Sequence, residues 1–243
     1  MESGPSGFQG HFATYESAVH GIASVRNLKE LRKSQDSLPK KKVIGKYNEG
    51  GSTFFGAQWN PVLQKWTLPF PGSDASVVRR TQKHDSKLNA SGIFSFSARF
   101  GVPSRLNVLA FYFFGFVVQM LAKFSLGRWM LLKFPQLFTK GLFSHEGPSE
   151  TQMKETKFTI LLQCFGLEKK KEQQVQRSLK FFIHGPEPGY VATPRIISSC
   201  ARALHDELDK IAIRGVLTPS VAFRHTHVME YMQTRGITQK SET

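Results

Sequence analysis

The sequence has few cysteines and none of the spacings that bind zinc. Only Cys164 and Cys200 are present, so at most one internal disulfide can form, and neither lies in a Cys-x-x-Cys or Cys/His cluster. This scarcity favours a reducing compartment. The first residues also lack the basic and apolar regions of a secretory signal, so we expect an intracellular protein.

Motifs for phosphate binding and nucleophilic catalysis are missing as well. There is no Gly-Lys-Ser/Thr and no Gly-x-Ser-x-Gly, and Gly4, Gly7 and Gly10 do not have dinucleotide-fingerprint spacing. Backbone amides approach a phosphate closely only where side chains are absent, so we predict no cofactor site in this chain. His225 and His227 lie on one side of an extended segment without a third ligand nearby. We therefore predict no catalytic, cofactor or metal residues.

Length, hydrophobicity and charge nevertheless predict a folded protein with an anionic partner. The chain has 243 residues, 40% hydrophobic and 21% charged, which is close to the composition of globular proteins. Its formal net charge is +15. Such an excess of cations favours nucleic acid or phospholipid headgroups as neighbours, and the net charge alone does not choose between them.

Acidic residues are absent from one long segment that is rich in phenylalanine. No Asp or Glu occurs at 86–145, and eleven of the 21 phenylalanines lie at 93–143. Within it, the 17 uncharged residues from Leu106 to Ala122 would span about 25 Å as a helix. That is short of the roughly 30 Å of a bilayer's hydrocarbon core, so the stretch is marginal as a membrane span.

Two interpretations of this segment remain from periodicity: a buried core helix followed by an amphipathic one, or an element at a membrane surface. The lack of acidic residues favours the membrane, because each cation near an anionic surface gains about 1 kcal/mol. We predict a monotopic or re-entrant helical insertion at 104–143. The predicted membrane-contacting residues are Phe111, Phe113, Phe114, Phe116, Arg128, Trp129, Lys133, Phe134 and Phe138. Nucleic-acid binding is disfavoured because the aromatics are not interleaved with basic residues.

The remaining pattern predicts an α/β (α+β) fold, with a mixed β-sheet that carries helices on one face and is interrupted by the insertion. Residues 34–61 are expected to form a flexible basic loop, and a charged loop at 168–172 to join two antiparallel strands. Thr14 is expected to cap the first helix. The predicted helices are 14–34, 73–82, 193–208 and 228–234, and the predicted strands are 43–44, 65–68, 157–165 and 179–183.

The run from Gly185 to Pro194 is the most unusual one in the sequence. It predicts a rigid turn between a strand and a helix that presents Glu187, Tyr190 and Thr193 at the helix N-terminus. Such a corner could bind a polar ligand. The alternative is a structural turn in which the Glu and Thr side chains only cap backbone amides.

The same run contributes to a resemblance to a known family. Together with the runs at 72–81, 127–135 and 215–219, it resembles the saccharopine dehydrogenase-like oxidoreductases of eukaryotes, relatives of bacterial trans-acting enoyl reductases. The Leu-Leu-Lys-Phe-Pro sequence at 131–135 is most similar to that of plant members. These blocks follow the family's order and cover essentially the whole chain.

The resemblance implies that residues 1–243 form the carboxy-terminal domain of a family member. In the family, a Rossmann domain that binds NAD(P) precedes the motif that is Ser3-Gly4-Pro5 here. Thr14 and Ser17 match a helix start of the family, although Ala13 stands where glycine is usual. Thr14 and Ser17 therefore join Glu187, Tyr190 and Thr193 as candidate substrate-binding residues.

Two functional hypotheses follow from the resemblance, which implies an NAD(P)-dependent oxidoreductase of lipid droplets, mitochondria or other membranes with a role in glycolipid synthesis. The first is a truncated, lipid-associated member without autonomous catalysis. The second is a substrate-domain subunit completed by a separate Rossmann-domain chain. Self-association through exposed apolar surface is expected in either case.

Overall fold

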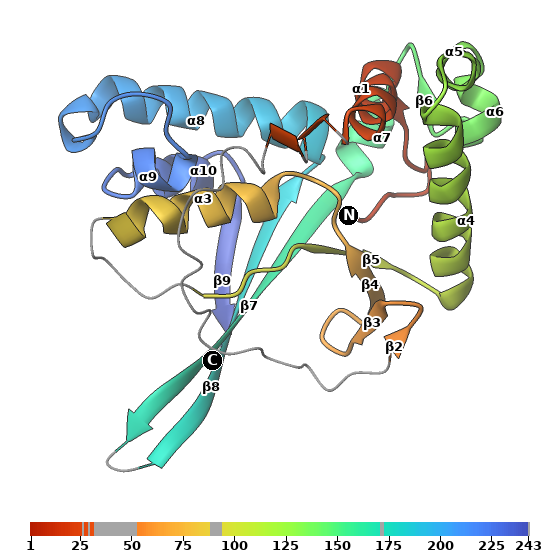
Figure 1. Cartoon of the computed structure of the whole chain (residues 1–243). Helices are drawn as coiled ribbons and strands as arrows, with labels where there is room; N and C mark the ends of the chain where they lie inside the picture. Colours follow the sequence, from red (N-terminus) through yellow and green to blue (C-terminus); the bar gives the residue numbers. More distant parts are fainter. Residues whose placement is uncertain (26, 29, 32–52, 88–93, 171–172, 243) are drawn as a thin grey trace. The chain divides into compact units, whose positions relative to one another are not determined.

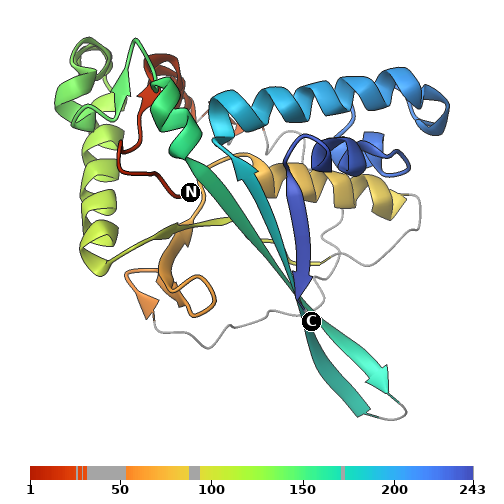
Figure 2. The ribbon, with the colours of Figure 1, turned by 180° about the vertical axis from the view of Figure 1, so that it is seen from behind.

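The computed structural model describes residues 1–25, 27–28, 30–31, 53–87, 94–170 and 173–242, and it divides into two compact units. The hairpin unit combines Met1–His11 with Glu146–Thr243, and the aromatic unit is Phe12–His145. Figures 1 and 2 show their elements from opposite sides. The predicted strand at 43–44 and most of the predicted loop at 34–61 lie outside the described residues.

A long antiparallel hairpin gives the hairpin unit its sheet. Strands β7 (Lys157–Lys170) and β8 (Gln173–Pro186) pair along their whole length, and β9 (Thr238–Glu242) pairs with the other edge of β8 (Figure 1). The two predicted strands and their pairing are confirmed. The predicted loop at 168–172 is wrong in extent, because Glu168 pairs with Val175. Charged side chains can project from a hairpin without interrupting its backbone hydrogen bonds.

Short helices surround one long helix in this unit. Helix α8 (Thr193–Asp206) begins at the predicted residue, with proline in its first turn. Helix α10 ends before Gly236, whose φ of 83° suits glycine, as predicted. The other elements are β1 (Gly10–His11), α7 (Glu150–Glu155), the π-helical turn η1 (Pro188–Ala192), the 3-10 turn η2 (Leu208–Lys210), α9 (Pro219–Phe223) and α10 (Val228–Gln233).

The aromatic unit contains a four-stranded antiparallel meander, β2 (Thr53–Phe54), β3 (Ala57–Asn60), β4 (Lys65–Pro69) and β5 (Arg99–Val102). The strand predicted at 65–68 is confirmed. Residues 53–60 form β2 and β3, so this part of the predicted flexible loop is ordered. Its aromatic residues, Phe54 and Trp59, pack against a core of Ala57, Trp66, Leu68 and Val108. Burial of these rings outweighs the glycine-rich, basic composition of the surrounding sequence.

Helices complete the aromatic unit. The predicted helix at 14–34 begins two residues earlier, so Thr14 lies inside its first turn and not at its cap. The insertion predicted at 104–143 is confirmed as helical. The elements are α1 (Phe12–Ala23), α3 (Asp74–Lys87), α4 (Arg105–Ala122), α5 (Ser125–Lys133), α6 (Pro135–Thr139) and the short strand β6 (Phe143–Ser144).

A second core cluster joins α1, α4 and α5. It consists of Tyr15, Val19, Val118, Ala122 and Leu131. Burial raises the pKa of the Tyr15 hydroxyl to about 12. The two clusters together hold α4 at both ends, because Val108 belongs to the sheet core and Val118 to the helical one.

The predicted α/β (α+β) class is confirmed, and the sheets differ from the prediction in one respect. The four-stranded and three-stranded sheets are separate and antiparallel, where one mixed sheet was expected. The sheets are antiparallel because their strands are joined by short connections. A two-residue link such as that between β2 and β3 can join only antiparallel neighbours.

Candidate lipid-binding surface

Helix α4 (Arg105–Ala122) carries no charged residue after Arg105 and is mostly exposed. It begins after Ser104, whose Oγ accepts a hydrogen bond from the Asn107 amide at 3.2 Å. Its 18 residues have a mean hydropathy of 1.5, and 17% of them are buried. By length and composition alone it could cross a membrane, and it is the one such helix within the described ranges. The alternative of a buried core helix does not agree with this exposure.

The exposed residues of α4 form a continuous stripe at helical spacing. Val108, Val118 and Ala122 face the cores and are buried. On the other side, Leu106 is 76% and Phe113 is 73% exposed. In a soluble protein, this outward side of a helix is normally polar. The exposed stripe consists of Leu106, Leu109, Phe113, Phe116 and Met120.

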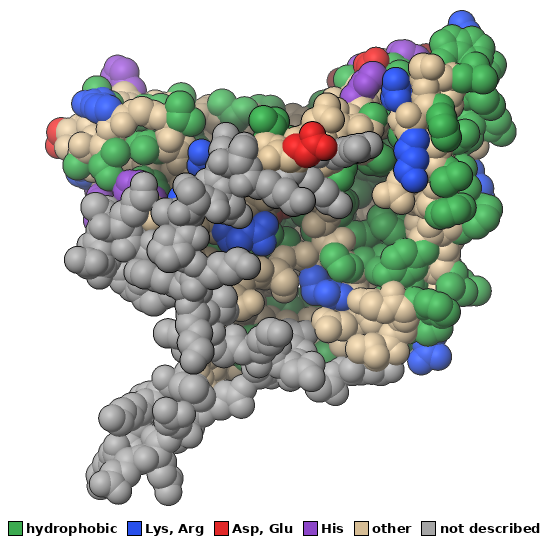
Figure 3. Space-filling model, in the orientation of Figure 1, with side chains coloured by type: hydrophobic (Ala, Val, Ile, Leu, Met, Phe, Trp, Pro, Cys, Tyr) green, Lys and Arg blue, Asp and Glu red, His purple; other side chains and the backbone are tan. Residues whose placement is uncertain are grey.

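The next two helices continue this apolar surface. Gly127 allows α5 to approach α4, because a Cβ at this position would lie 2.2 Å from the Leu121 carbonyl oxygen. Arg128 Nη1 donates to the carbonyl oxygen of Ala122 at 3.0 Å, which satisfies the C-terminus of α4. Figure 3 shows hydrophobic side chains gathered over α4 and α5. The exposed apolar residues of this part are Phe124, Leu126, Trp129, Met130, Phe134, Leu137 and Leu142.

We call the exposed apolar residues of α4, α5 and α6 the α4–α6 surface. Its charges have one sign, since no Asp or Glu occurs at 86–145. Lys123, Lys133 and Lys140 are exposed at or near helix ends. An exposed apolar patch bordered by cations matches the order of hydrocarbon and anionic headgroups in a lipid monolayer.

Most of the nine predicted membrane-contacting residues lie on this surface. Phe111, Phe113, Phe114, Phe116, Trp129, Lys133 and Phe134 are exposed. Phe138 is half-buried against the second core cluster, and the half-buried Arg128 is bound to the end of α4. Sequence reasoning missed Leu106, Leu126 and Leu137, which are among the most exposed apolar residues. Helical spacing from Phe113 would have found Leu106.

The predicted polar corner serves the fold. The carboxylate of Glu187 is buried and accepts hydrogen bonds from the amides of Gly189 at 2.8 Å, Tyr190 at 2.5 Å and Val191 at 3.2 Å. Thr193 Oγ1 donates to the Pro188 carbonyl at 2.7 Å. This geometry agrees with the structural alternative, in which Glu and Thr cap backbone groups.

The other candidate substrate-binding residues are Tyr190, Thr14 and Ser17. Tyr190 Oη accepts from the His11 amide at 3.1 Å. Thr14 and Ser17 are exposed on α1, which belongs to the other unit. An open groove of about 430 Å³ lies beside the turn. Its lining residues are Glu150, Met153, Lys154, Pro186, Val191 and Arg195, which include no serine, threonine or cysteine.

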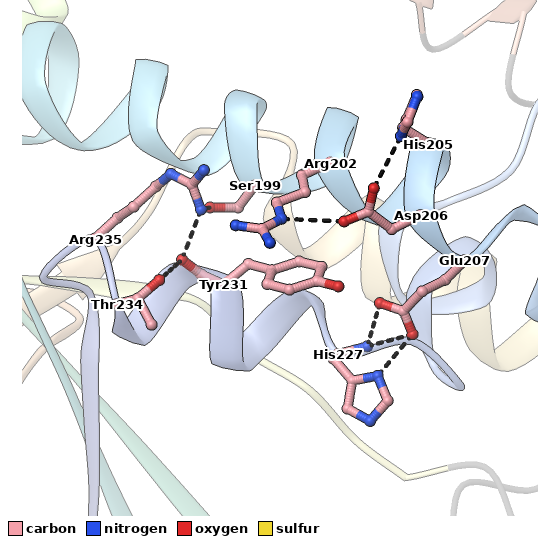
Figure 4. Close-up of polar contacts among 9 residues, drawn as sticks. All are labelled: Ser199, Arg202, His205, Asp206, Glu207, His227, Tyr231, Thr234 and Arg235. Atoms are coloured by element: carbon pink, nitrogen blue, oxygen red, sulfur yellow. Dashed lines mark hydrogen bonds and ion pairs between the residues drawn. The ribbon is translucent and has the colours of Figure 1, made fainter.

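A polar cluster that the sequence analysis missed joins α8 to α10 (Figure 4). Glu207 is buried and accepts hydrogen bonds from Lys210 Nζ and His227 Nδ1, both at 2.7 Å. The bond from Lys210 is the main reason that the pKa of Glu207 falls to about 2. The Arg202 guanidinium stacks over the Tyr231 ring, with its Cζ atom 4.7 Å from the ring centroid.

This cluster does not form a metal centre. No three His, Cys, Asp or Glu side chains are placed to hold a metal ion in the part of the chain that the structure describes. The Glu207 carboxylate instead accepts a hydrogen bond from the His227 backbone amide at 3.1 Å. This bond connects the start of α10 to the end of α8. Nothing in local spacing predicts this pair, because the two residues are 20 positions apart with η2 and α9 between them.

Comparison with known proteins gives relatives that align with nearly the whole chain. A probable mitochondrial saccharopine dehydrogenase-like oxidoreductase of Arabidopsis thaliana is 29% identical over 94% of the chain. The saccharopine dehydrogenase-like oxidoreductase of Mus musculus is 32% identical over 98%. Over nearly its whole length, this chain is a homologue of saccharopine dehydrogenase-like oxidoreductases.

The similarity to these saccharopine dehydrogenase-like oxidoreductases confirms the resemblance seen in the sequence motifs. A lipid droplet localized protein of Caenorhabditis elegans is also similar, with 24% identity over 99% of the chain. The chain spans about half the length of these relatives, 55% for the Arabidopsis and mouse proteins and 58% for the worm protein. No family model and no solved structure matches it.

Proposed function

We propose that this saccharopine dehydrogenase-like chain attaches its protein to an intracellular lipid surface through the α4–α6 surface. The observation that carries the proposal is the exposure of α4, in which Leu106 and Phe113 are about three-quarters exposed at 76% and 73%. Water contact of so many large apolar side chains is unfavourable, and burial in acyl chains removes it.

The packing of α4 favours a helix that lies along the membrane over one that crosses it. Val108 is buried against the four-stranded sheet, and Val118 and Ala122 against the cluster with α1. A spanning α4 would carry the strands that contact it into hydrocarbon, where exposed backbone groups have no hydrogen-bond partners. We therefore assign a monotopic arrangement, with the outward stripe of α4 among the acyl chains.

The magnitudes show why the cations belong to the site. Burial of five half-exposed apolar side chains contributes on the order of 5 kcal/mol. Association costs about 4 kcal/mol or more in lost freedom, so the stripe alone gives weak binding. Lys123, Lys133 and Lys140 add about 1 kcal/mol each near an anionic surface. The proposal is a two-part attachment, apolar and electrostatic.

The names of the relatives support a lipid surface and leave two organelles open. The worm relative is named for lipid droplets and the Arabidopsis relative for mitochondria. For this chain we propose one of these membranes and a family-level role in lipid or glycolipid metabolism. Association with lipid is the function for which the described residues supply a surface.

The resemblance implies an NAD(P) cofactor, and the glycines at the start of the chain do not fit its phosphates. The glycine-rich start of the chain is the nearest candidate for a phosphate cradle. A Cβ at Gly4 would lie 2.5 Å from Glu155 Oε2, and this oxygen accepts from the Ser6 amide at 3.0 Å. A carboxylate in this position would repel a phosphate. For the second hypothesis, a subunit completed by a Rossmann-domain chain, Glu187 is committed to capping the turn, and Tyr190 and Thr193 stay candidate ligand groups.

Vesicle flotation tests the proposal. The purified chain should float with vesicles that contain anionic lipid, and Phe113→Ser with Phe116→Ser should reduce the bound fraction at least tenfold. Deletion of 106–143 is unsuitable, because it removes buried Val108, Val118 and Leu131. A chain that stays monomeric without detergent and does not float with vesicles would refute the proposal.

The matched control is Val216→Ser, which changes an apolar residue that is 105% exposed in the hairpin unit. It removes exposed hydrophobic area without touching the α4–α6 surface. Binding equal to that of the unsubstituted chain is expected for the control. Equal loss in the control and in the double variant would show that general hydrophobicity, and not this surface, causes binding.

A further inference from the structure

The hairpin between β2 and β3 has an unusual residue at its tip. Phe54 pairs with Ala57, so Phe55 and Gly56 form a two-residue connection. Their φ angles are 49° and 78°, both positive, as a type I′ turn requires. Asn-Gly and Asp-Gly are the sequences that suit this turn, and a bulky side chain is disfavoured there. Phe55 therefore occupies a position where the backbone prefers asparagine.

Burial in a core does not offset the unfavourable backbone conformation of Phe55, because its ring is exposed. It is 74% exposed, and it makes one edge-to-face contact, with Phe54 at 5.0 Å between ring centroids. The turn itself is firmly placed, since Tyr112 Oη donates to the Phe55 carbonyl at 2.7 Å. The backbone at the tip is thus fixed while the ring points to solvent.

The contact with Tyr112 joins this tip to the flank of α4. Tyr112 follows the exposed stripe residue Leu109 by one helical turn and precedes Phe113 directly. A cation lies close by, because the Arg105 guanidinium is 5.6 Å from the Phe54 ring centroid and 5.0 Å from that of Trp66. The tip therefore combines an exposed aromatic ring with a nearby positive charge, the combination found at membrane interfaces.

We infer that Phe55 is a second lipid anchor, which extends the α4–α6 surface onto the four-stranded sheet. The inference rests on the proposed function and adds a contact from an element outside the helical insertion. Its occupant is an anionic phospholipid surface, with the ring at the level of the glycerol and upper acyl groups and Arg105 at the level of the phosphates.

The substitution Phe55→Asn separates an anchoring role from a structural one. Asparagine suits the positive φ, so the melting temperature of the variant should equal or exceed that of the unsubstituted chain. Loss of a ring that inserts into lipid should lower the vesicle partition coefficient about tenfold. Phe55→Trp should keep or strengthen binding, because tryptophan favours the interface. Val216→Asn is the control for added polarity and should bind normally.

Each result decides the inference. Weaker flotation of Phe55→Asn at unchanged or raised melting temperature supports the anchor. Unchanged flotation, while Phe113→Ser with Phe116→Ser loses binding, overturns the anchor and leaves the proposed function standing. A lowered melting temperature for Phe55→Asn shows a packing role and also overturns the anchor. Absence of flotation for the unsubstituted chain refutes the proposed function itself.

Discussion

Replacement of Gly127 by alanine should destabilise the junction between α4 and α5. The added Cβ would lie 2.2 Å from the Leu121 carbonyl oxygen and 2.8 Å from its carbonyl carbon. Both atoms belong to the backbone, so no side-chain rotation relieves the contact and α5 must move away from α4. Overpacking of this kind costs about 1–3 kcal/mol.

Two further effects change the free energy of unfolding of Gly127→Ala. Movement of α5 weakens the 3.0 Å hydrogen bond from Arg128 to the Ala122 carbonyl, and a hydrogen bond to a charged group contributes about 1.5–3 kcal/mol. Alanine regains about 1 kcal/mol of helix propensity over glycine. The expected net loss for Gly127→Ala is about 1–3 kcal/mol, or a fall in melting temperature of about 2–12 °C.

Gly115→Ala provides a control with the opposite sign. Gly115 lies in α4, and a Cβ there would meet nothing within 4 Å. Helix propensity alone predicts a gain of about 0.5–1 kcal/mol. Thermal and urea unfolding of the two variants measures both changes. Equal or higher stability of Gly127→Ala would refute the tight approach of α5 to α4.

Two substitutions and one ligand titration test other parts of the protein. Glu187→Gln, which leaves one acceptor oxygen for three amides, should lower the free energy of unfolding by about 1–2 kcal/mol; stability equal to the parent chain would contradict the capping role. The pKa of Glu207 falls from 4.5 to about 2, so its stabilising effect is complete above pH 4.5 and is lost as the pH falls toward 2. Urea unfolding between pH 5 and 2.5 should show a smaller decline in Glu207→Gln, and identical profiles would argue against this linkage. Titration with NADH or NADPH should give no fluorescence enhancement, whereas micromolar binding would overturn the prediction of no autonomous dehydrogenase activity.

Local patterns in the sequence were sufficient for α8, α10 and the strands β4, β7 and β8, but they did not predict the other six described strands. The start of α8 at Thr193 and the end of α10 before Gly236 depend on proline and glycine within one turn. The hairpin of β7 and β8 depends on apolar runs that are adjacent in the chain. Residues 53–60 were predicted to be part of a flexible loop because their local sequence does not indicate a sheet. They form β2 and β3 because they pack in a core that includes Val108 of α4, which is distant in the sequence.

The sequence by itself determined the α/β class, the helical and cation-bordered insertion, and the resemblance to saccharopine dehydrogenase-like oxidoreductases, because these depend on spacing, composition and motif order. The tertiary structure alone decided which side of α4 is exposed, that Glu187 caps a turn, and that Phe55 projects from a hairpin tip. Burial and hydrogen bonding depend on partners far apart in the chain. Phe55 and Tyr112 are 57 positions apart, and His11 and Tyr190 are 179 positions apart. No local periodicity encodes such a contact, because only the folded chain brings its two partners together.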